Sequence, residues 1–190
     1  MSKLKEKEIA EINQRISKPM SDSDLEKYLG VKAEDIIKYS ELKEYATIDD
    51  LLPKDKTFRI ILLEETYNSG HWIALMRYGH TIEFFNSYGT PPDKDWRFVN
   101  RMVRVVLGEN TNELTRLMKQ ADEAGYDAIY NKIDFQRHDN RVETCGRWCI
   151  LRIEMMRMGY DLKEFGELIL EMCKKLGQST DFVVSMLVSK

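Results

Sequence analysis

Residues 72–86 read Trp72-Ile73-Ala74-Leu75-Met76-Arg77-Tyr78-Gly79-His80-Thr81-Ile82-Glu83-Phe84-Phe85-Asn86, two largely apolar runs on either side of the turn signal Gly79-His80. Such runs around a glycine-containing turn are typical of two antiparallel strands joined as a hairpin. In a hairpin the start of the first strand lies beside the end of the second. We therefore predict that His71, directly before the first strand, lies close to Asn86, which ends the second.

The chain upstream of the hairpin is predicted to be mainly helical. Residues 3–17 carry apolar side chains at a loosely helical spacing, and shorter helices are expected over 25–29 and 33–39. Residues 1–50 thus read as a helical N-terminal extension. The β-branched and apolar run at 58–63 then predicts a buried strand.

The chain downstream of the hairpin alternates between helical and strand patterns. Apolar spacing predicts helices over 96–107, 112–124, 145–158 and 162–176, and partial alternation predicts one more strand within 126–136. The expected fold is an α+β domain with a small mixed sheet.

Composition indicates one globular unit, residues 1–190, with a catalytic core over 58–160. Of its residues 43% are hydrophobic and 32% charged, which is an ordinary globular balance. The formal charge of −3 gives no bias toward nucleic acid or anionic membranes, and the charged N-terminus is unlike a signal peptide. Three cysteines do not make a disulfide framework, so a reducing compartment is expected.

Cys145 has the best surroundings for a nucleophile. It lies in Glu143-Thr144-Cys145-Gly146-Arg147-Trp148, between a polar loop and a predicted helix. A helix N-terminus favours the thiolate form of a cysteine. Gly146, which lacks a side chain, would let a substrate backbone approach closely.

The other groups that thiol-based hydrolysis requires also have candidates. His71 can serve as the general base, and Asn86 can orient its ring through a hydrogen bond. Gln136, at the end of a predicted strand, can offer its side-chain amide to an oxyanion. The backbone N–H of Cys145 is the second expected donor.

The ordered set Gly70-His71-Trp72, Phe84-Phe85-Asn86-Ser87-Tyr88-Gly89, Gln136 and Thr144-Cys145-Gly146 resembles the clan of the adenovirus maturation protease and the ubiquitin-like-protein-specific proteases. The resemblance covers residues 58–160. It implies a papain-like cysteine peptidase fold of the adenain type, in which a small mixed β-sheet packs against a central helix that carries the nucleophile at its N-terminus.

By this resemblance Cys145 is the nucleophile, His71 the base, Asn86 the third member of the triad and Gln136 the oxyanion donor, while Trp72 joins Gly146 in binding substrate. The third member is commonly Asp or Glu in this clan, and Asn is the papain variant. The separation between Gln136 and Cys145 is also longer than usual, so Asp134 or Asn140 stay open as alternatives to Gln136.

The resemblance also implies a substrate, partners and a location. It implies a cysteine endopeptidase, without a cofactor, that processes viral capsid or core precursors during virion maturation, after a small residue such as glycine. The location implied is the host cytoplasm at the virus assembly site, or the virion. A peptide or DNA activator is an open partner, whereas no membrane partner is expected.

Other functions stay open beside this one. The first is a deubiquitinase or deSUMOylase type of isopeptidase, which uses the same chemistry on ubiquitin-like modifiers. A non-enzymatic binding module and an acyltransferase are the others. Arg97, Arg101 and Arg104 share one face of a predicted helix, which is usually a solvated face and only secondarily a contact for nucleic acid or an acidic peptide.

The remaining cysteines and histidines are expected to have structural or solvated roles. Cys149 and Cys173 fall within apolar helical stripes and are predicted to be core residues. His80 and His138 are expected to be exposed imidazoles. A metal site built from His71, His138 and Cys145 would lack the tight spacing of metal ligands, so no metal is expected.

Overall fold

The computed structural model describes residues 5–94 and 101–189. In these residues a mixed sheet of five strands has the order β1-β2-β3-β4-β5. The strands are β1 (Ile36–Lys38), β2 (Phe58–Thr66), β3 (Ser69–Tyr78), β4 (Thr81–Phe85) and β5 (Asp127–Tyr130). The inner pairs β2–β3 and β3–β4 are antiparallel, whereas β1–β2 and β4–β5 are parallel.

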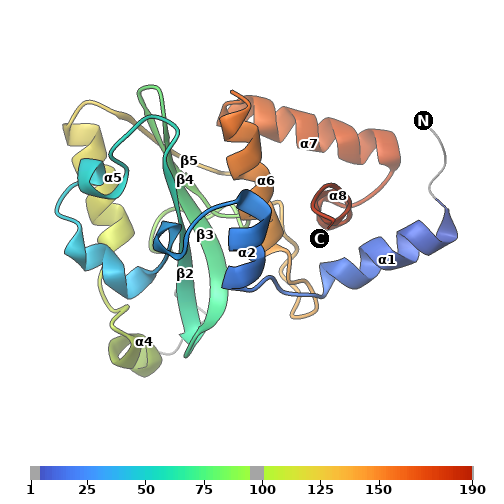
Figure 1. The fold of residues 1–190 in the computed structure, drawn as a ribbon, viewed down its shortest axis with the longest axis horizontal. Helices are drawn as coiled ribbons and strands as arrows, with labels where there is room; N and C mark the ends of the chain where they lie inside the picture. The colour runs from blue at the N-terminus through green and yellow to red at the C-terminus, as the bar shows by residue number, and fades with distance from the viewer. Residues whose placement is uncertain (1–4, 95–100, 190) are drawn as a thin grey trace.

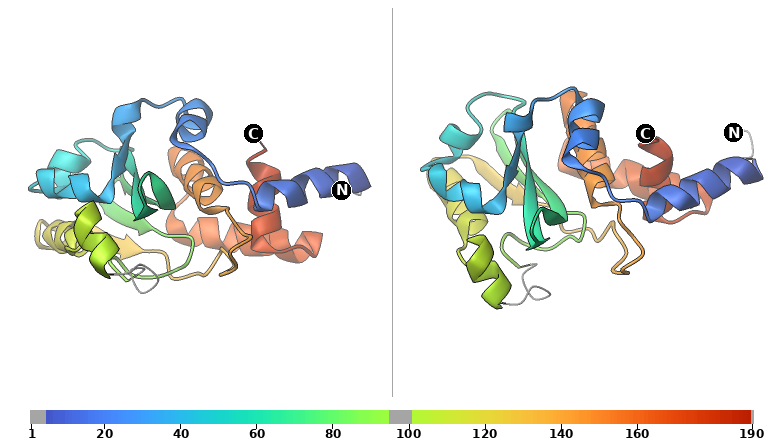
Figure 2. Two further views of the ribbon diagram at one scale, coloured as in Figure 1. Left: turned by 90° about the horizontal axis from the view of Figure 1, so that it is seen from below. Right: turned by 60° about the horizontal axis from the view of Figure 1, so that its bottom comes forward.

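Helices cover both faces of the sheet (Figure 1). They are α1 (Glu6–Ile16), α2 (Asp22–Leu29), α3 (Ile48–Leu51), α4 (Arg101–Leu107), α5 (Glu113–Glu123), α6 (Cys145–Arg157), α7 (Leu162–Leu176) and α8 (Thr180–Leu187), with 3₁₀ turns η1 (Ala33–Asp35) and η2 (Tyr39–Glu44). Helix α5 and η2 lie on one side, while α2, α6, α7 and α8 lie on the other (Figures 1 and 2).

The central residues of β2 and β3, 60–63 and 72–76, are apolar because both faces of the sheet are buried there. Side chains that point to one face, such as Ile60 and Ala74, belong to the core around α6. Side chains that point to the opposite face, such as Ile61 and Ile73, belong to the core around α3 and α5. The sheet is therefore the middle layer of three.

Helix α6 is fixed to the sheet by a fully buried ion pair. Arg152 Nε and Nη2 donate to the two carboxylate oxygens of Glu83 on β4, at 2.8 and 2.7 Å. Both side chains are inaccessible to solvent. Tyr78 donates its hydroxyl to the same carboxylate (2.6 Å), and Arg152 Nη1 donates to the carbonyl of Tyr160 (3.1 Å). This network fixes the position of α6 relative to β3 and β4.

The hairpin and the strand predicted over 58–63 are confirmed, and both strands that flank the β2–β3 turn are longer than predicted. The placement of His71 directly before a strand was wrong, because His71 lies within β3 and pairs with Leu63 of β2. The predicted fold class of a mixed α and β domain with a mixed sheet is confirmed.

Three predicted elements differ from the structure. The helix predicted over 33–39 is instead η1, β1 and the start of η2, since Ile36 and Ile37 extend to pair with β2. The strand predicted within 126–136 covers only β5, because the backbone N–H groups of Phe135 and Gln136 both donate to the carbonyl of Ser87 instead of pairing with a strand. Gln136 therefore lies in a loop and not at a strand end. Of the helix predicted over 96–107, α4 is present and residues 96–100 lie outside the described part.

The two ends of the described chain pack together on the α6 side of the sheet. Helix α1 lies against α8, which also contacts α6 and α7 (Figure 2). Arg15 on α1 donates to the backbone oxygen of Ser185 on α8 (3.5 Å). Helix α8 was not predicted. It ties the N-terminal extension to the helix that carries Cys145.

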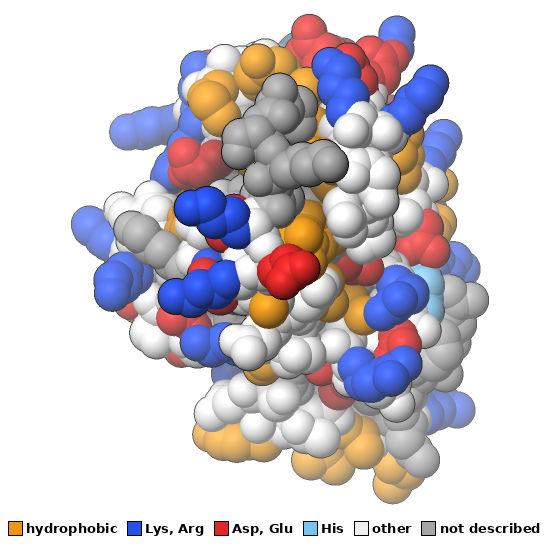
Figure 3. Space-filling model, turned by 90° about the vertical axis from the view of Figure 1, so that its right-hand side faces the viewer, with side chains coloured by type: hydrophobic (Ala, Val, Ile, Leu, Met, Phe, Trp, Pro, Cys, Tyr) orange, Lys and Arg blue, Asp and Glu red, His pale blue; other side chains and the backbone are white. Residues whose placement is uncertain are grey.

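The surface carries mixed charge on the face drawn in Figure 3, where Lys and Arg side chains are interspersed with Asp and Glu. This pattern agrees with the small formal charge of −3. None of the helices in residues 5–94 and 101–189 has the length and apolar character needed to span a membrane.

A buried carboxyl next to β2 predicts a pH-dependent stability. Glu109 is fully buried, and its Oε1 accepts the backbone N–H of Glu64 (2.9 Å). Burial raises the pKa of Glu109 to about 7; the hydrogen bond from Glu64 N–H, Arg104 and Lys38 oppose the rise, and the Glu64 charge adds to it. The fold therefore favours protonated Glu109. This stabilisation is complete below the ordinary pKa of 4.5 and is lost as pH rises through 7.

We expect the free energy of unfolding of the wild type to fall relative to that of Glu109→Gln, by roughly 1–3 kcal/mol, between about pH 5 and about pH 8. Urea unfolding of both proteins across this range measures the difference. A difference that stays constant with pH would show that Glu109 is equally ionised in the folded and unfolded states over this range, so that folding does not raise its pKa.

Candidate active site

Cys145 is the first residue of α6, as predicted. Its side chain is a free thiol and only 5% of the residue is exposed. The preceding residue Thr144 donates its hydroxyl to Asp181 of α8 (2.7 Å), and the same carboxylate accepts the backbone N–H of Arg137 (3.1 Å). The loop before Cys145 is thus fixed from both sides, and the thiol has one defined place at the helix N-terminus.

His71 and Asn86 are joined by a hydrogen bond, with His71 Nε2 and Asn86 Oδ1 2.8 Å apart. The predicted contact is present. Asn86 Oδ1 also accepts the backbone N–H of Tyr88 (3.0 Å), and Asn86 Nδ2 donates to Thr90 Oγ1 (2.9 Å). Because a backbone N–H can only donate, the amide atom that faces Tyr88 is the oxygen. In the neutral ring His71 Nε2 therefore carries the proton, and Nδ1 keeps the lone pair that a base needs.

Gln136 follows the buried Phe135 and is itself 2% exposed. Its backbone N–H donates to the carbonyl of Ser87 (3.0 Å), and Ser87 Oγ donates to Gln136 Oε1 (2.8 Å). Gln136 Nε2 donates to the carbonyl of Val142 (3.1 Å) and to the hydroxyl of Tyr88 (3.3 Å). The amide orientation is defined because a carbonyl accepts only from the nitrogen.

One cavity of about 410 Å³ brings these groups together. His71, Gln136 and Cys145 all line it. Glu65 and Glu143 stand at the same cavity; burial raises the pKa of Glu143, the charge of Glu65 adds to this, and His71 opposes it. The cavity therefore combines a thiol, an imidazole and an amide with carboxylates beside them.

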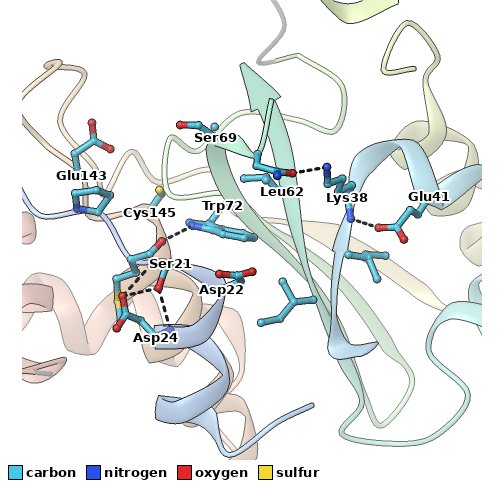
Figure 4. Close-up of a pocket in the computed structure, with 16 residues that line it drawn as sticks. Ser21, Asp22, Asp24, Lys38, Glu41, Leu62, Ser69, Trp72, Glu143 and Cys145 are labelled. Carbon is cyan, nitrogen blue, oxygen red and sulfur yellow. Dashed lines mark hydrogen bonds between the residues drawn. The ribbon is translucent and has the colours of Figure 1, made fainter. Parts of the chain in front are cut away.

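A second cavity of about 720 Å³ also meets Cys145, together with Trp72 (Figure 4). One wall of it is the segment that links α1 to α2. Trp72 Nε1 donates to the carbonyl of Met20 (2.9 Å), and the backbone N–H of Glu143 donates to Ile16 (2.7 Å). We call this segment, residues 16–22, the N-terminal strap. It lies directly against the start of α6.

Gly146 takes a different neighbour from the predicted one. A Cβ on Gly146 would lie 2.9 Å from Met20 Cβ and 3.3 Å from Trp72 Cδ1. The missing side chain thus allows the N-terminal strap to approach α6. Trp72, in contrast, lines the larger cavity, as a residue that binds substrate would.

The other cysteines and histidines are distributed as follows. Cys149 is buried in the core, and burial raises the pKa of its thiol. Burial likewise raises the pKa of the partly buried Cys173. His80 is exposed and lies near Tyr126, with ring centroids 5.4 Å apart. Among the described residues no three His, Cys, Asp or Glu side chains form a group that could hold a metal ion.

His138 is exposed, as predicted, but it is not simply solvated. Its Nε2 lies 3.0 Å from Asp134 Oδ2, and its ring stacks on Tyr88 with centroids 4.4 Å apart. It also lines the 410 Å³ cavity. The alternatives Asp134 and Asn140 are placed unequally: Asn140 lines this cavity and Asp134 pairs with His138.

Sequence reasoning missed two residues that organise the site. Asp181, which holds the loop before Cys145, comes from α8, and nothing local in the sequence connects the two. Tyr88 lies in the run quoted for the resemblance, two residues after Asn86, but no role was assigned to it. The aromatic side chain next to a triad candidate was the signal that could have identified it.

Comparison with known proteins gives one informative relative. The chain is 34% identical over 169 residues to "Uncharacterized protein V9" of Sputnik virophage. This match covers 88% of the chain and 93% of the relative. The chain belongs to the V9 family. No family model matches the chain, and no solved structure matches it.

The relationship to V9 includes the candidate site. The match covers 88% of the chain, so even with the whole remainder at one end the matched range extends from before His71 to beyond Cys145. The relative comes from a virophage, which suggests a viral origin for this chain.

Proposed function

We propose that this protein is a cysteine endopeptidase with a papain-like fold of the adenain type. The observation that carries the proposal is the 2.8 Å hydrogen bond between His71 and Asn86, in a cavity that Cys145 also lines. An imidazole whose Nε2 is hydrogen-bonded to an amide oxygen keeps Nδ1 available as a base. Cys145 is also the first residue of the 13-residue helix α6, where backbone N–H groups without helical partners are available to an oxyanion.

In the proposed reaction His71 Nδ1 takes the proton of the Cys145 thiol, and the sulfur attacks the carbonyl carbon of the scissile peptide. The negative charge that develops on the carbonyl oxygen is stabilised by the backbone N–H of Cys145 and the amide of Gln136. The C–N bond then breaks, His71 protonates the leaving amine, and a thioester remains. Water deprotonated by His71 hydrolyses this thioester, and the thiol regains its proton.

The two cavities on either side of Cys145 provide room for a peptide. They measure about 410 and 720 Å³, and Gly70, Glu143 and Cys145 line both. An extended chain that crosses the boundary between them would present one bond to the sulfur. Its residues on the side of the larger cavity would lie in the space that Trp72 and the N-terminal strap line.

The virophage relative supports the finer proposal that the substrates are viral proteins. We propose that the enzyme cleaves capsid or core precursors during virion maturation, in the host cytoplasm at the assembly site or in the virion. A peptidase confined to newly made particles needs no secretory route, in keeping with three unpaired cysteines.

The decisive experiment compares the purified protein with its Cys145→Ala variant on a diverse peptide library, with cleavage products identified by mass spectrometry. We expect products from the wild type alone. Cys149→Ala is the matched control, because it removes a buried thiol from the same helix and should keep cleavage. Products that are equal in the Cys145→Ala sample would overturn the assignment of the nucleophile.

Substrate class is tested separately with fluorogenic ubiquitin and SUMO probes beside viral capsid precursors. A maturation peptidase cuts the precursors and leaves the probes largely intact. Cleavage of the probes alone would replace the maturation proposal by an isopeptidase. If peptides, precursors and probes all stay intact and Cys145 does not react with iodoacetamide at neutral pH, the peptidase proposal fails.

A further inference from the structure

Tyr88 contacts three of the four candidate catalytic residues. Its ring stacks on the imidazole of His71, with centroids 4.5 Å apart and planes 17° from parallel. Its backbone N–H donates to Asn86 Oδ1 (3.0 Å), and its hydroxyl accepts the Gln136 amide (3.3 Å). Tyr88 also lines the cavity that holds Cys145.

The contact with Gln136 concerns the hydrogen atom that would stabilise an oxyanion. One N–H of the Gln136 amide is held by the carbonyl of Val142 at 3.1 Å. The second N–H points to the hydroxyl oxygen of Tyr88. At 3.3 Å this bond is longer than the usual range of about 2.7–3.2 Å, so it is the weaker of the two and the one that an oxyanion can replace.

The position of Tyr88 is itself fixed. The turn that follows it requires glycine, because Gly89 has φ +66° and a Cβ there would lie 2.7 Å from the backbone carbon of Ile133. His138 packs on the Tyr88 ring, with planes 26° from parallel, and is held in turn by Asp134. A side chain held this way can transmit its position to the groups that it touches.

We propose that Tyr88 is a positioning residue that fixes the orientations of the base His71 and the oxyanion donor Gln136 relative to each other. Its ring keeps the His71 imidazole in the plane in which Asn86 binds it. Its hydroxyl keeps the second N–H of Gln136 directed into the cavity until the oxyanion takes it over. This inference rests on the proposed function and adds that the two halves of the catalytic apparatus are coupled through one side chain.

Two substitutions separate the two contacts. Tyr88→Phe removes the hydroxyl and keeps the ring, whereas Tyr88→Leu removes both. Peptide hydrolysis depends on base and oxyanion donor, but alkylation of Cys145 by iodoacetamide forms no oxyanion and depends only on the thiol and its base. Tyr126→Phe is the matched control, because Tyr126 donates its hydroxyl to Asp49 (2.6 Å) and lines neither cavity.

For Tyr88→Phe we expect kcat to fall about 3- to 10-fold, because the second N–H of Gln136 is then no longer held toward the cavity before the oxyanion forms and must be ordered in that step. KM should stay within about twofold and alkylation should be unchanged. For Tyr88→Leu we expect alkylation to slow as well and kcat to fall at least about tenfold further. Tyr126→Phe should match the wild type in both assays. Melting temperatures of all variants verify that they are folded.

The outcomes separate this inference from the proposed function. If the wild type hydrolyses peptides and Tyr88→Phe does so with the same kcat, the role of the hydroxyl is refuted. If Tyr88→Phe slows alkylation as much as hydrolysis, the two contacts are not separable and the coupling model is wrong. A wild type that neither hydrolyses nor alkylates refutes the proposed function itself.

Discussion

Replacing His71 by alanine is expected to lower kcat/KM for peptide hydrolysis by roughly 10³- to 10⁶-fold, the range found when one member of a nucleophile–base unit is removed. The change removes the base that is proposed to take the thiol proton and to return it to the leaving amine. KM should change little, because His71 contacts the reacting atoms and not the rest of the peptide. Steady-state kinetics on the cleaved peptide from the library give both values.

His80→Ala is the control for this experiment, since His80 is exposed in the turn between β3 and β4. It should leave kcat/KM unchanged. His71→Ala also leaves the buried Asn86 with one partner fewer, which costs about 1–3 kcal/mol of stability, so its folded fraction is verified by circular dichroism. A His71→Ala protein that retains a tenth of the activity would exclude His71 as the base.

Replacing Arg152 by leucine is expected to destabilise the protein by about 3–5 kcal/mol. The change leaves Glu83 buried and ionisable without its guanidinium, in a position with no exposure to solvent. For a chain of this length the loss corresponds to a fall in melting temperature of about 6–20 °C. Urea unfolding and thermal melts measure the two quantities.

Two control variants show whether the loss of stability comes from the buried charge that Arg152→Leu leaves unpaired. Arg141→Leu removes an exposed arginine that pairs with Asp139, and it should change the stability far less than Arg152→Leu does. Arg152→Met combined with Glu83→Leu removes both charges and should recover most of the loss, because the penalty comes from the unpaired charge. A loss below about 1 kcal/mol for Arg152→Leu alone would mean that water or another cation replaces the guanidinium.

The sheet was predictable where hydrophobic patterning alone determines it. The hairpin and the contact between His71 and Asn86 follow from two apolar runs and one turn. Strand β1 was not predictable, because Ile36 and Ile37 fit a short helix equally well until β2 is available as a partner. Local pattern decides an element only when no distant strand competes for the same residues.

The residues of the candidate site were predictable from the sequence, but the hydrogen bonds that connect them were not. The order of His71, Asn86, Gln136 and Cys145 is a sequence property, whereas the two acceptors of the Gln136 amide lie 48 and 6 positions away. The ion pair between Glu83 and Arg152 likewise joins residues 69 positions apart. A single sequence gives no means of pairing charges across such separations.

The N-terminal strap has a practical meaning for anyone who shortens or tags this protein. A cut just before α2 would keep all five strands and the helix that bears Cys145, but it would remove α1, which packs against α8. The truncated protein would also lack most of the cavity wall that the N-terminal strap forms beside Cys145. It would lose the carbonyls of Ile16 and Met20, which accept hydrogen bonds from Glu143 and Trp72. Loss of activity in such a truncated protein would therefore reflect the missing binding surface and would not mean that the catalytic residues were wrongly assigned.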